Sequence, residues 1–91
     1  MKQQHIEQQT LVVQSDENID KIIAGIKFLH AKNILIILLS NVPVLQNAAD
    51  FWSLHQFAQK ENIKLTFAGV DKTVLSTAKL LGYKVDSDQR W

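Results

Sequence analysis

The stretch that decides the fold is residues 34–83, which read ILIILLSNVPVLQNAADFWSLHQFAQKENIKLTFAGVDKTVLSTAKLLGY. Its first six residues are all apolar, which is typical of a strand buried on both faces and predicts a central parallel strand covered by helices. An amphipathic helix follows and ends near Asn62, with an apolar face formed by Phe51, Leu54, Phe57 and Ala58 and with His55 near that face. Residues 63–68 then alternate in hydrophobicity, which indicates a strand with one face only partly covered.

Capping residues mark the ends of two helices. Asn47 is a good N-cap for the helix that follows it, and Asp50 three residues on approximates a capping box. Asp71 is expected to cap the last helix in the same way. Gly82 lies where a left-handed residue would close that helix, and Tyr83 would make the accompanying hydrophobic contact. The apolar stripe of this last helix is Val74, Ala78 and Leu81.

The N-terminal third adds one strand and one helix. Residues 9–14 are β-branched or apolar between polar neighbours, as in a short strand. Ser15 or Asp16 is the expected N-cap of an amphipathic helix over residues 19–31. Gly25 in the interior of this helix costs about 1 kcal/mol relative to alanine, and a close contact between helix and sheet would explain its presence.

Together these elements predict an α/β fold with the order β(β)αβαβα(β). Right-handed helical crossovers between parallel strands make a small sandwich, with a mostly parallel sheet of about four strands and three or more helices. The optional strands are residues 5–6 and 84–86. Residues 1–91 form a single domain, in which residues 1–4 and 87–91 are the candidates for flexible tails.

Composition narrows the classes of function. Ten basic and nine acidic side chains leave a net charge of +1, which offers no strong field for nucleic acid or for an anionic membrane. The chain has no cysteine, which excludes thiolate catalysis and disulfides and fits a cytoplasmic protein. The N-terminal residues lack the apolar core of a signal peptide, and no apolar run is long enough to insert into a membrane.

The sequence contains no recognisable catalytic or metal-binding set. Three histidines are the only candidates for metal binding or proton transfer: His5, His30 and His55. They lie far apart and lack a paired spacing such as HxxxH, and a hydrogen-bonded structural role is expected for His55. The three glycines are isolated, so no phosphate-binding loop is present. We therefore expect a protein that is not an enzyme and that holds no metal or cofactor.

Two segments carry a resemblance to a known family. Residues 39–49 read LSNVPVLQNAA, and residues 68–82 read AGVDKTVLSTAKLLG. Their loop chemistry, in this order of strands and helices, resembles the STAS domain of anti-sigma-factor antagonists, of sulfate-transporter tails and of small subunits of lipid transporters. The resemblance covers nearly the whole chain and implies a non-enzymatic module that binds a protein partner.

The chain departs from the family pattern where that family is regulated. In phosphorylated members a kinase modifies a serine at the start of a helix, and the added charge breaks a contact between proteins. Asn47 stands at that serine, Gln46 at the preceding acidic residue, Ala49 at the usual glycine and Leu38 at a strand aspartate. The resemblance therefore implies a constitutive binder, or one regulated through its partner, with no phosphorylation at Asn47.

The resemblance also implies where the partner binds. The surface would be the loop over residues 41–46 and the exposed side of the following helix. The expected partner-binding residues are Asn41, Pro43, Val44, Gln46, Asn47, Ala48 and Trp52. Val44 and Trp52 would offer exposed apolar area, although a packed Trp52 and a plain loop at Pro43 and Val44 are the alternatives.

Three readings of the partner stay open at this point. The first is an anti-sigma or kinase-like switch protein, and the second is the ATPase of an ABC lipid-transport system. The third is a nucleotide or lipid headgroup at the helix starts near Asn47 and Asp71, where Asp50 and Asp71 would oppose a phosphate. A homodimer is also left open.

Overall fold

The computed structural model describes residues 8–86. The expectations for residues 1–4, for His5, for a strand at residues 5–6 and for a tail at residues 87–91 lie outside this range. Within it, no helix combines the length and the apolar character that crossing a membrane requires.

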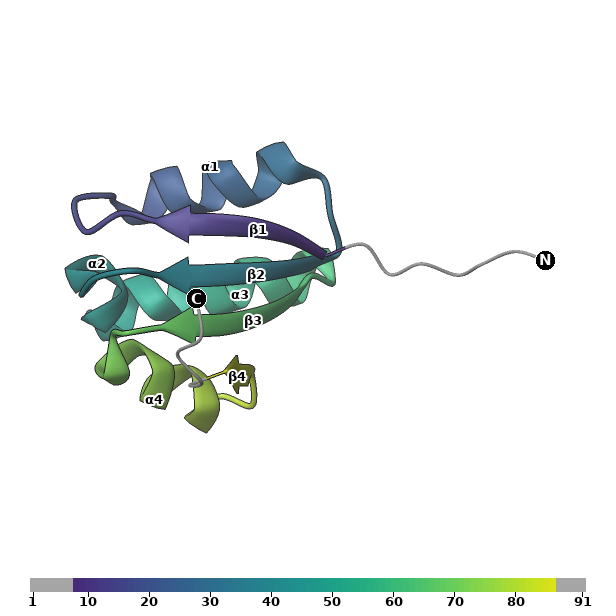
Figure 1. Cartoon of the computed structure of the whole chain (residues 1–91). Coiled ribbons are helices and arrows are strands. Elements are labelled where there is room, and N and C mark those ends of the chain that lie inside the picture. Colours follow the sequence, from purple (N-terminus) through teal and green to yellow (C-terminus); the bar gives the residue numbers. More distant parts are fainter. Residues whose placement is uncertain (1–7, 87–91) are drawn as a thin grey trace.

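Residues 8–86 form four strands and four helices, which confirms the predicted α/β class (Figure 1). In chain order they are β1 (Gln8–Val13), α1 (Ile19–Leu29), β2 (Asn33–Leu38), α2 (Pro43–Gln46), α3 (Ala48–Glu61), β3 (Lys64–Gly69), α4 (Lys72–Leu80) and β4 (Lys84–Asp86). The optional closing strand at residues 84–86 is therefore present as β4. The segment expected to be a loop before α3 contains the short helix α2, which begins at Pro43.

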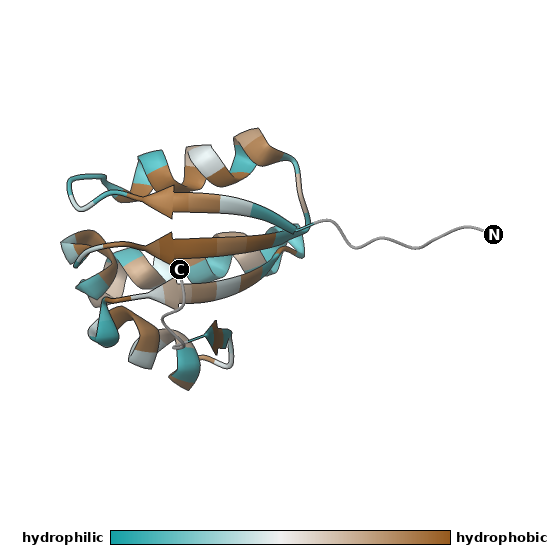
Figure 2. Ribbon diagram, viewed as in Figure 1, coloured by the Kyte–Doolittle hydropathy of each residue, from teal (hydrophilic) through white to brown (hydrophobic). Residues whose placement is uncertain are grey.

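The sheet is fully parallel, with the order β1-β2-β3-β4. Each new strand is added at the same edge of the sheet, and each crossover is right-handed. The connecting helices therefore all lie on one face of the sheet. Figure 1 shows α1 and α3 behind the strands in this view. The prediction that β2 is buried on both faces is wrong for this reason. Its side chains alternate between buried and partly exposed, although β2 is almost continuously hydrophobic (Figure 2).

The hydrophobic core fills the space between this face and the helices. The strands contribute the buried residues Val13, Ile34, Ile36, Leu38, Leu65 and Phe67, and the helices contribute Ile22, Ile26, Leu45, Phe51, Leu54, Ala58, Val74, Leu75 and Ala78. The rings of Phe51 and Phe67 lie 5.6 Å apart, which joins α3 to β3. The predicted apolar faces of α3 and α4 are thus confirmed.

The ends of α1 differ from the expected residues. Asn18 is its N-cap, through a bond of 2.9 Å from the Lys21 amide to the Asn18 side chain, in place of Ser15 or Asp16. The helix ends at Leu29, where His30 turns left-handed with φ 50°. The close contact expected at Gly25 is confirmed, since a Cβ at this position would lie 3.1 Å from Cδ1 of Leu11 in β1.

The predicted caps of α3 and α4 are confirmed. The Asn47 side chain accepts from the Asp50 amide at 3.1 Å, and the Asp71 side chain accepts from the Val74 amide at 3.2 Å. At the end of α4, Gly82 has φ 93°, and the amide of Tyr83 bonds back to the Ala78 carbonyl at 3.0 Å. This is the Schellman arrangement predicted for the Gly-Tyr pair.

Candidate functional site

The carboxyl ends of β2 and β3 carry two exposed apolar side chains. Leu38 and Gly69 are partners in the register, and the residues that follow them are Leu39 and Val70. The Val70 amide donates to the Leu38 carbonyl at 2.8 Å, which extends the pairing by one step. Leu39 is 61% exposed and Val70 is 47% exposed. This end of the sheet therefore exposes apolar area to solvent.

Asp71 connects three segments at the same end of the sheet. Its side chain is only 1% exposed, and it is the one charged residue buried among those described. One carboxylate oxygen caps α4 by accepting from the Val74 amide. The other accepts from the Val42 amide at 2.7 Å and from Nε2 of Gln46 at 3.0 Å. The start of α4 thus holds both ends of the α2 segment in place.

Local chemistry explains why α2 presents some side chains and buries others. Pro43 occupies the first turn of α2, where its missing N–H costs nothing. A residue before proline favours extended backbone, and Val42 has φ −122° and ψ 90°. Val42 and Leu45 are buried, which leaves Pro43 and Gln46 exposed on the outer side.

Asn47 forms the junction between α2 and α3. Its backbone is extended, with φ −83° and ψ 124°, and its side chain is engaged as the α3 cap. Ala48 is exposed and lies four residues before Trp52, so the two side chains are neighbours on the helix surface. Trp52 is 50% exposed, which makes the core-packing alternative for this residue wrong.

Trp52 rests on a polar aromatic pair. Its ring centroid lies 5.0 Å from that of His55, and Nδ1 of His55 lies 2.6 Å from the hydroxyl oxygen of Tyr83. The Tyr83 ring in turn packs at 5.4 Å against the buried Phe67. His55 is therefore a hydrogen-bonded structural histidine, as expected. His55 and Tyr83 therefore connect the exposed indole of Trp52 to the hydrophobic core.

Replacing Tyr83 with phenylalanine should lower the free energy of unfolding at neutral pH by about 0.5–1.5 kcal/mol, because the bond to His55 is lost. Burial raises the pKa of the Tyr83 hydroxyl above 10.0. The folded chain then keeps a proton that the unfolded chain releases. This contribution is fully present below about pH 10 and is lost as the pH rises through the folded pKa.

The measurement is denaturant unfolding of both proteins between about pH 8 and about pH 11. Taking the difference between wild type and Tyr83→Phe removes the titration of the lysines, which both proteins share. The gap should shrink above pH 10. A gap that stays constant over this range would contradict the assigned direction.

The structure brings most of the expected partner-binding residues to one end of the molecule. Asn41, Pro43, Gln46, Asn47 and Ala48 are all exposed, and Trp52 lies one helical turn further along α3. Val44 differs from the expectation, because it is partly buried and packs against the core. We call the exposed set, together with Leu39 and Val70, the docking surface.

Three residues of this region were missed or undervalued from sequence. The apolar run predicts that Leu39 lies in the buried strand, although its position next to Ser40 and Asn41 is a signal for a strand end. The sequence draws attention to Val70 only through the family resemblance. Asp71 was expected to be a cap, whereas its bonds reach back 29 and 25 residues. No local pattern encodes contacts at such separations.

The described residues offer no constellation for metal binding. Residues 8–86 hold no group of three His, Cys, Asp or Glu side chains that could bind a metal ion. His30 follows the last residue of α1, whereas His55 lies within α3. In comparisons with known proteins, the chain matches no protein-family model, no curated protein and no solved structure.

Proposed function

We propose that this chain is a STAS-like protein-interaction module that binds a regulatory protein in the cytoplasm through its docking surface. The observation that carries the proposal is the buried Asp71 carboxylate, which fixes the α2 segment from both ends. Burying a charged group costs free energy that its three hydrogen bonds must offset. A loop without a function would not require such a group to hold it in place. Its effect is to present an exposed loop in one conformation.

A prearranged surface favours binding because less conformational entropy is lost when the partner docks. Pro43 restricts its own backbone, and Asp71 restrains Val42 and Gln46. The α3 N-cap bond then fixes the turn at Asn47. A partner that recognises this surface meets side chains that are already in place.

The docking surface also contains the kinds of side chain that dominate interface energies. Trp52 is an exposed indole, and tryptophan is enriched among interface hot spots. Leu39 and Val70 add aliphatic area at the strand ends. The same surface includes the exposed amide side chains of Asn41, Gln46 and Asn47, the kind of group found in the polar rim of an interface.

The mode of regulation follows from Asn47. Its side chain carries no hydroxyl, and its oxygen is already used to cap α3. A phosphate switch at this point of the docking surface is therefore not part of the proposal. The module binds constitutively, or its partner is the regulated component.

The test uses Trp52→Ala and, as a control, Phe28→Ala. Phe28 is an exposed aromatic on α1, outside the docking surface, and is 81% exposed. Trp52→Ala should weaken partner binding by about 2 kcal/mol or more. Its free energy of unfolding should fall by less than about 1 kcal/mol, because the side chain is half exposed. Phe28→Ala should leave binding unchanged.

The measurement is quantitative affinity capture from an extract of the source cells, with denaturant unfolding of each variant. A protein lost with Trp52→Ala and retained with Phe28→Ala is the partner. A switch kinase in this role supports a signalling module, whereas an ABC ATPase supports a transporter subunit. Equal capture by wild type and Trp52→Ala would remove Trp52 from the interface and count against the docking surface.

A further inference from the structure

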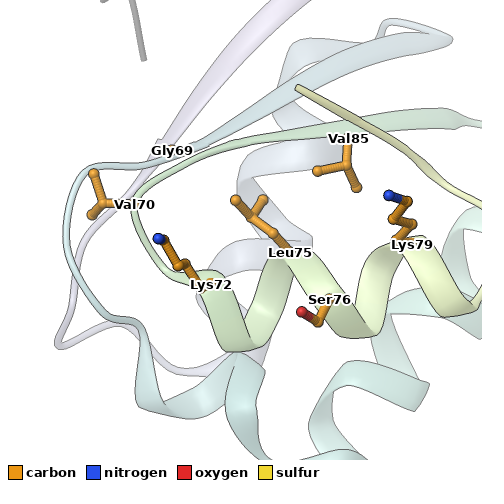
Figure 3. Close-up of a pocket in the computed structure, with 7 residues that line it drawn as sticks. All are labelled: Gly69, Val70, Lys72, Leu75, Ser76, Lys79 and Val85. Carbon is orange, nitrogen blue, oxygen red and sulfur yellow. The ribbon is translucent and has the colours of Figure 1, made fainter. Parts of the chain in front are cut away.

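A pocket of about 660 Å³ lies beside α4, next to the docking surface. The described residues that line it are Gly69, Val70, Lys72, Leu75, Ser76, Lys79 and Val85 (Figure 3). Four of them come from α4 and share one of its faces, because they are spaced by three, four and seven residues. The others come from the end of β3 and from β4. Val70 belongs to both the pocket and the docking surface.

The pocket combines an apolar floor with positive charge. Leu75 is only 6% exposed, and Val85 faces it from β4 (Figure 3). Lys72 and Lys79 stand toward opposite ends of the pocket in Figure 3. Within residues 8–86 neither ammonium group takes part in a hydrogen bond or an ion pair. None of the described lining residues is acidic, and the neighbouring Asp71 carboxylate is buried and engaged elsewhere.

The separation of the two lysines defines the spacing of a matching ligand. Seven residues of α-helix correspond to about 10.5 Å along the helix axis. A polyproline II segment has three residues per turn and rises about 3.1 Å per residue. Two side chains three residues apart in such a segment therefore lie on one side, about 9 Å from each other. An acidic residue at each of these positions can reach one lysine.

We propose that this pocket binds an acidic, extended segment of the protein partner, with two carboxylates three residues apart on Lys72 and Lys79. The residues between them project about 120° to either side of the line of the carboxylates, and an apolar one of them contacts Leu75. This inference rests on the proposed function, because Val70 joins the pocket to the docking surface and a bound partner would continue across it. The argument for a peptide is this continuity together with charge complementarity.

The test uses the peptide acetyl-Glu-Pro-Leu-Glu-amide and a second peptide with glutamine at both ends. Each is titrated into the full ¹⁵N-labelled chain at low salt, and the amide shifts of α4 are followed. The acidic peptide should bind saturably, and the glutamine peptide at least 10-fold more weakly. The double variant Lys72→Glu with Lys79→Glu should lose at least 10-fold in affinity for the acidic peptide.

The matched control is Lys64→Glu with Lys84→Glu, which makes the same change in charge. Both lysines are exposed strand residues, and neither lines the pocket. This variant should bind the acidic peptide within twofold of wild type. Equal losses in the two double variants would mean diffuse attraction and would overturn the proposal. The absence of saturable peptide binding would also overturn the proposal. If hexanedioate bound as tightly as the peptide, the pocket would instead be a site for a small molecule, and the proposal would be overturned as well.

The two proposals fail separately. If the affinity for the acidic peptide does not depend on Lys72 and Lys79, while Trp52→Ala still abolishes partner capture, the pocket proposal is overturned and the docking surface is supported. If the affinity for the acidic peptide depends on Lys72 and Lys79, while the Trp52→Ala variant captures the partner normally, the pocket proposal is supported and the docking-surface proposal is overturned.

Discussion

Replacing Asp71 with alanine should lower the free energy of unfolding by about 2–5 kcal/mol, through the loss of a helix cap and the exposure of unpaired buried groups. The buried amide of Val42 loses its acceptor, and the α4 cap bond to Val74 is lost as well. Gln46 is freed from the start of α4. Denaturant unfolding with a two-state analysis measures the loss.

The control for this prediction is Asn47→Ala. Asn47 is also an N-cap, but it is exposed and makes only the local bond to the Asp50 amide. Its replacement should cost about 1 kcal/mol, the ordinary value for a cap. The excess loss at Asp71 measures the tie between α2 and α4. If both variants lost the same stability, that tie would contribute nothing.

Gly69→Ala should destabilise the fold by more than about 4 kcal/mol, a loss large enough to prevent folding of a typical small domain. Gly69 has φ 128°, a conformation that L side chains rarely adopt. A Cβ here would overlap the carbonyl oxygen of Leu38 and would lie 2.7 Å from the Leu38 carbonyl carbon and nitrogen. These are backbone atoms of a central strand, so the neighbour cannot move aside. Thermal unfolding and circular dichroism report the loss.

Gly82→Ala separates strain from collision. Gly82 also has a positive φ, 93°, but a Cβ at this position would meet nothing within 4 Å. Its replacement should cost only about 1–2 kcal/mol, the penalty for a left-handed L residue. Comparable losses at both glycines would show that the contact with Leu38 relaxes, and would contradict the expectation for Gly69.

The parts of the fold that were predicted correctly depend on local chemistry. Asn47, Asp71 and Gly82 bond or turn within four residues, so their capping roles are legible in the sequence. The prediction that β2 is buried on both faces was wrong, because a run of six apolar residues does not indicate which elements cover each face of the strand. The order of the strands puts every crossover on one face, and that order is a property of the whole chain.

Competition among similar signals explains the remaining differences. Several polar residues precede α1, and Asn18 is the one next to the first core-facing isoleucine, Ile19. The sequence predicts a loop at Pro43, whereas the structure has it in the first turn of α2, a position where proline is common. At the candidate site, exposure of Pro43 and Trp52 could be anticipated from their neighbours. The link from Asp71 to Val42 and Gln46 could not, because it exists only after the sheet has formed.

The uninterrupted order of the four strands has a consequence for how the chain folds. Each strand pairs with the one before it in sequence, at separations of 25, 31 and 18 residues, as the pairs Gln8–Asn33, Asn33–Lys64 and Thr66–Lys84 show. No strand must wait for a distant segment before it can pair, so the loop-closure entropy of each step is modest. Synthesis from the N-terminus can therefore add one strand–helix unit at a time to a growing edge, as in repeat proteins. The hydrogen bonds from Val42 and Gln46 to Asp71 form only when the third of these units docks on the second. Their presence therefore indicates that α4 has joined the folded part of the chain.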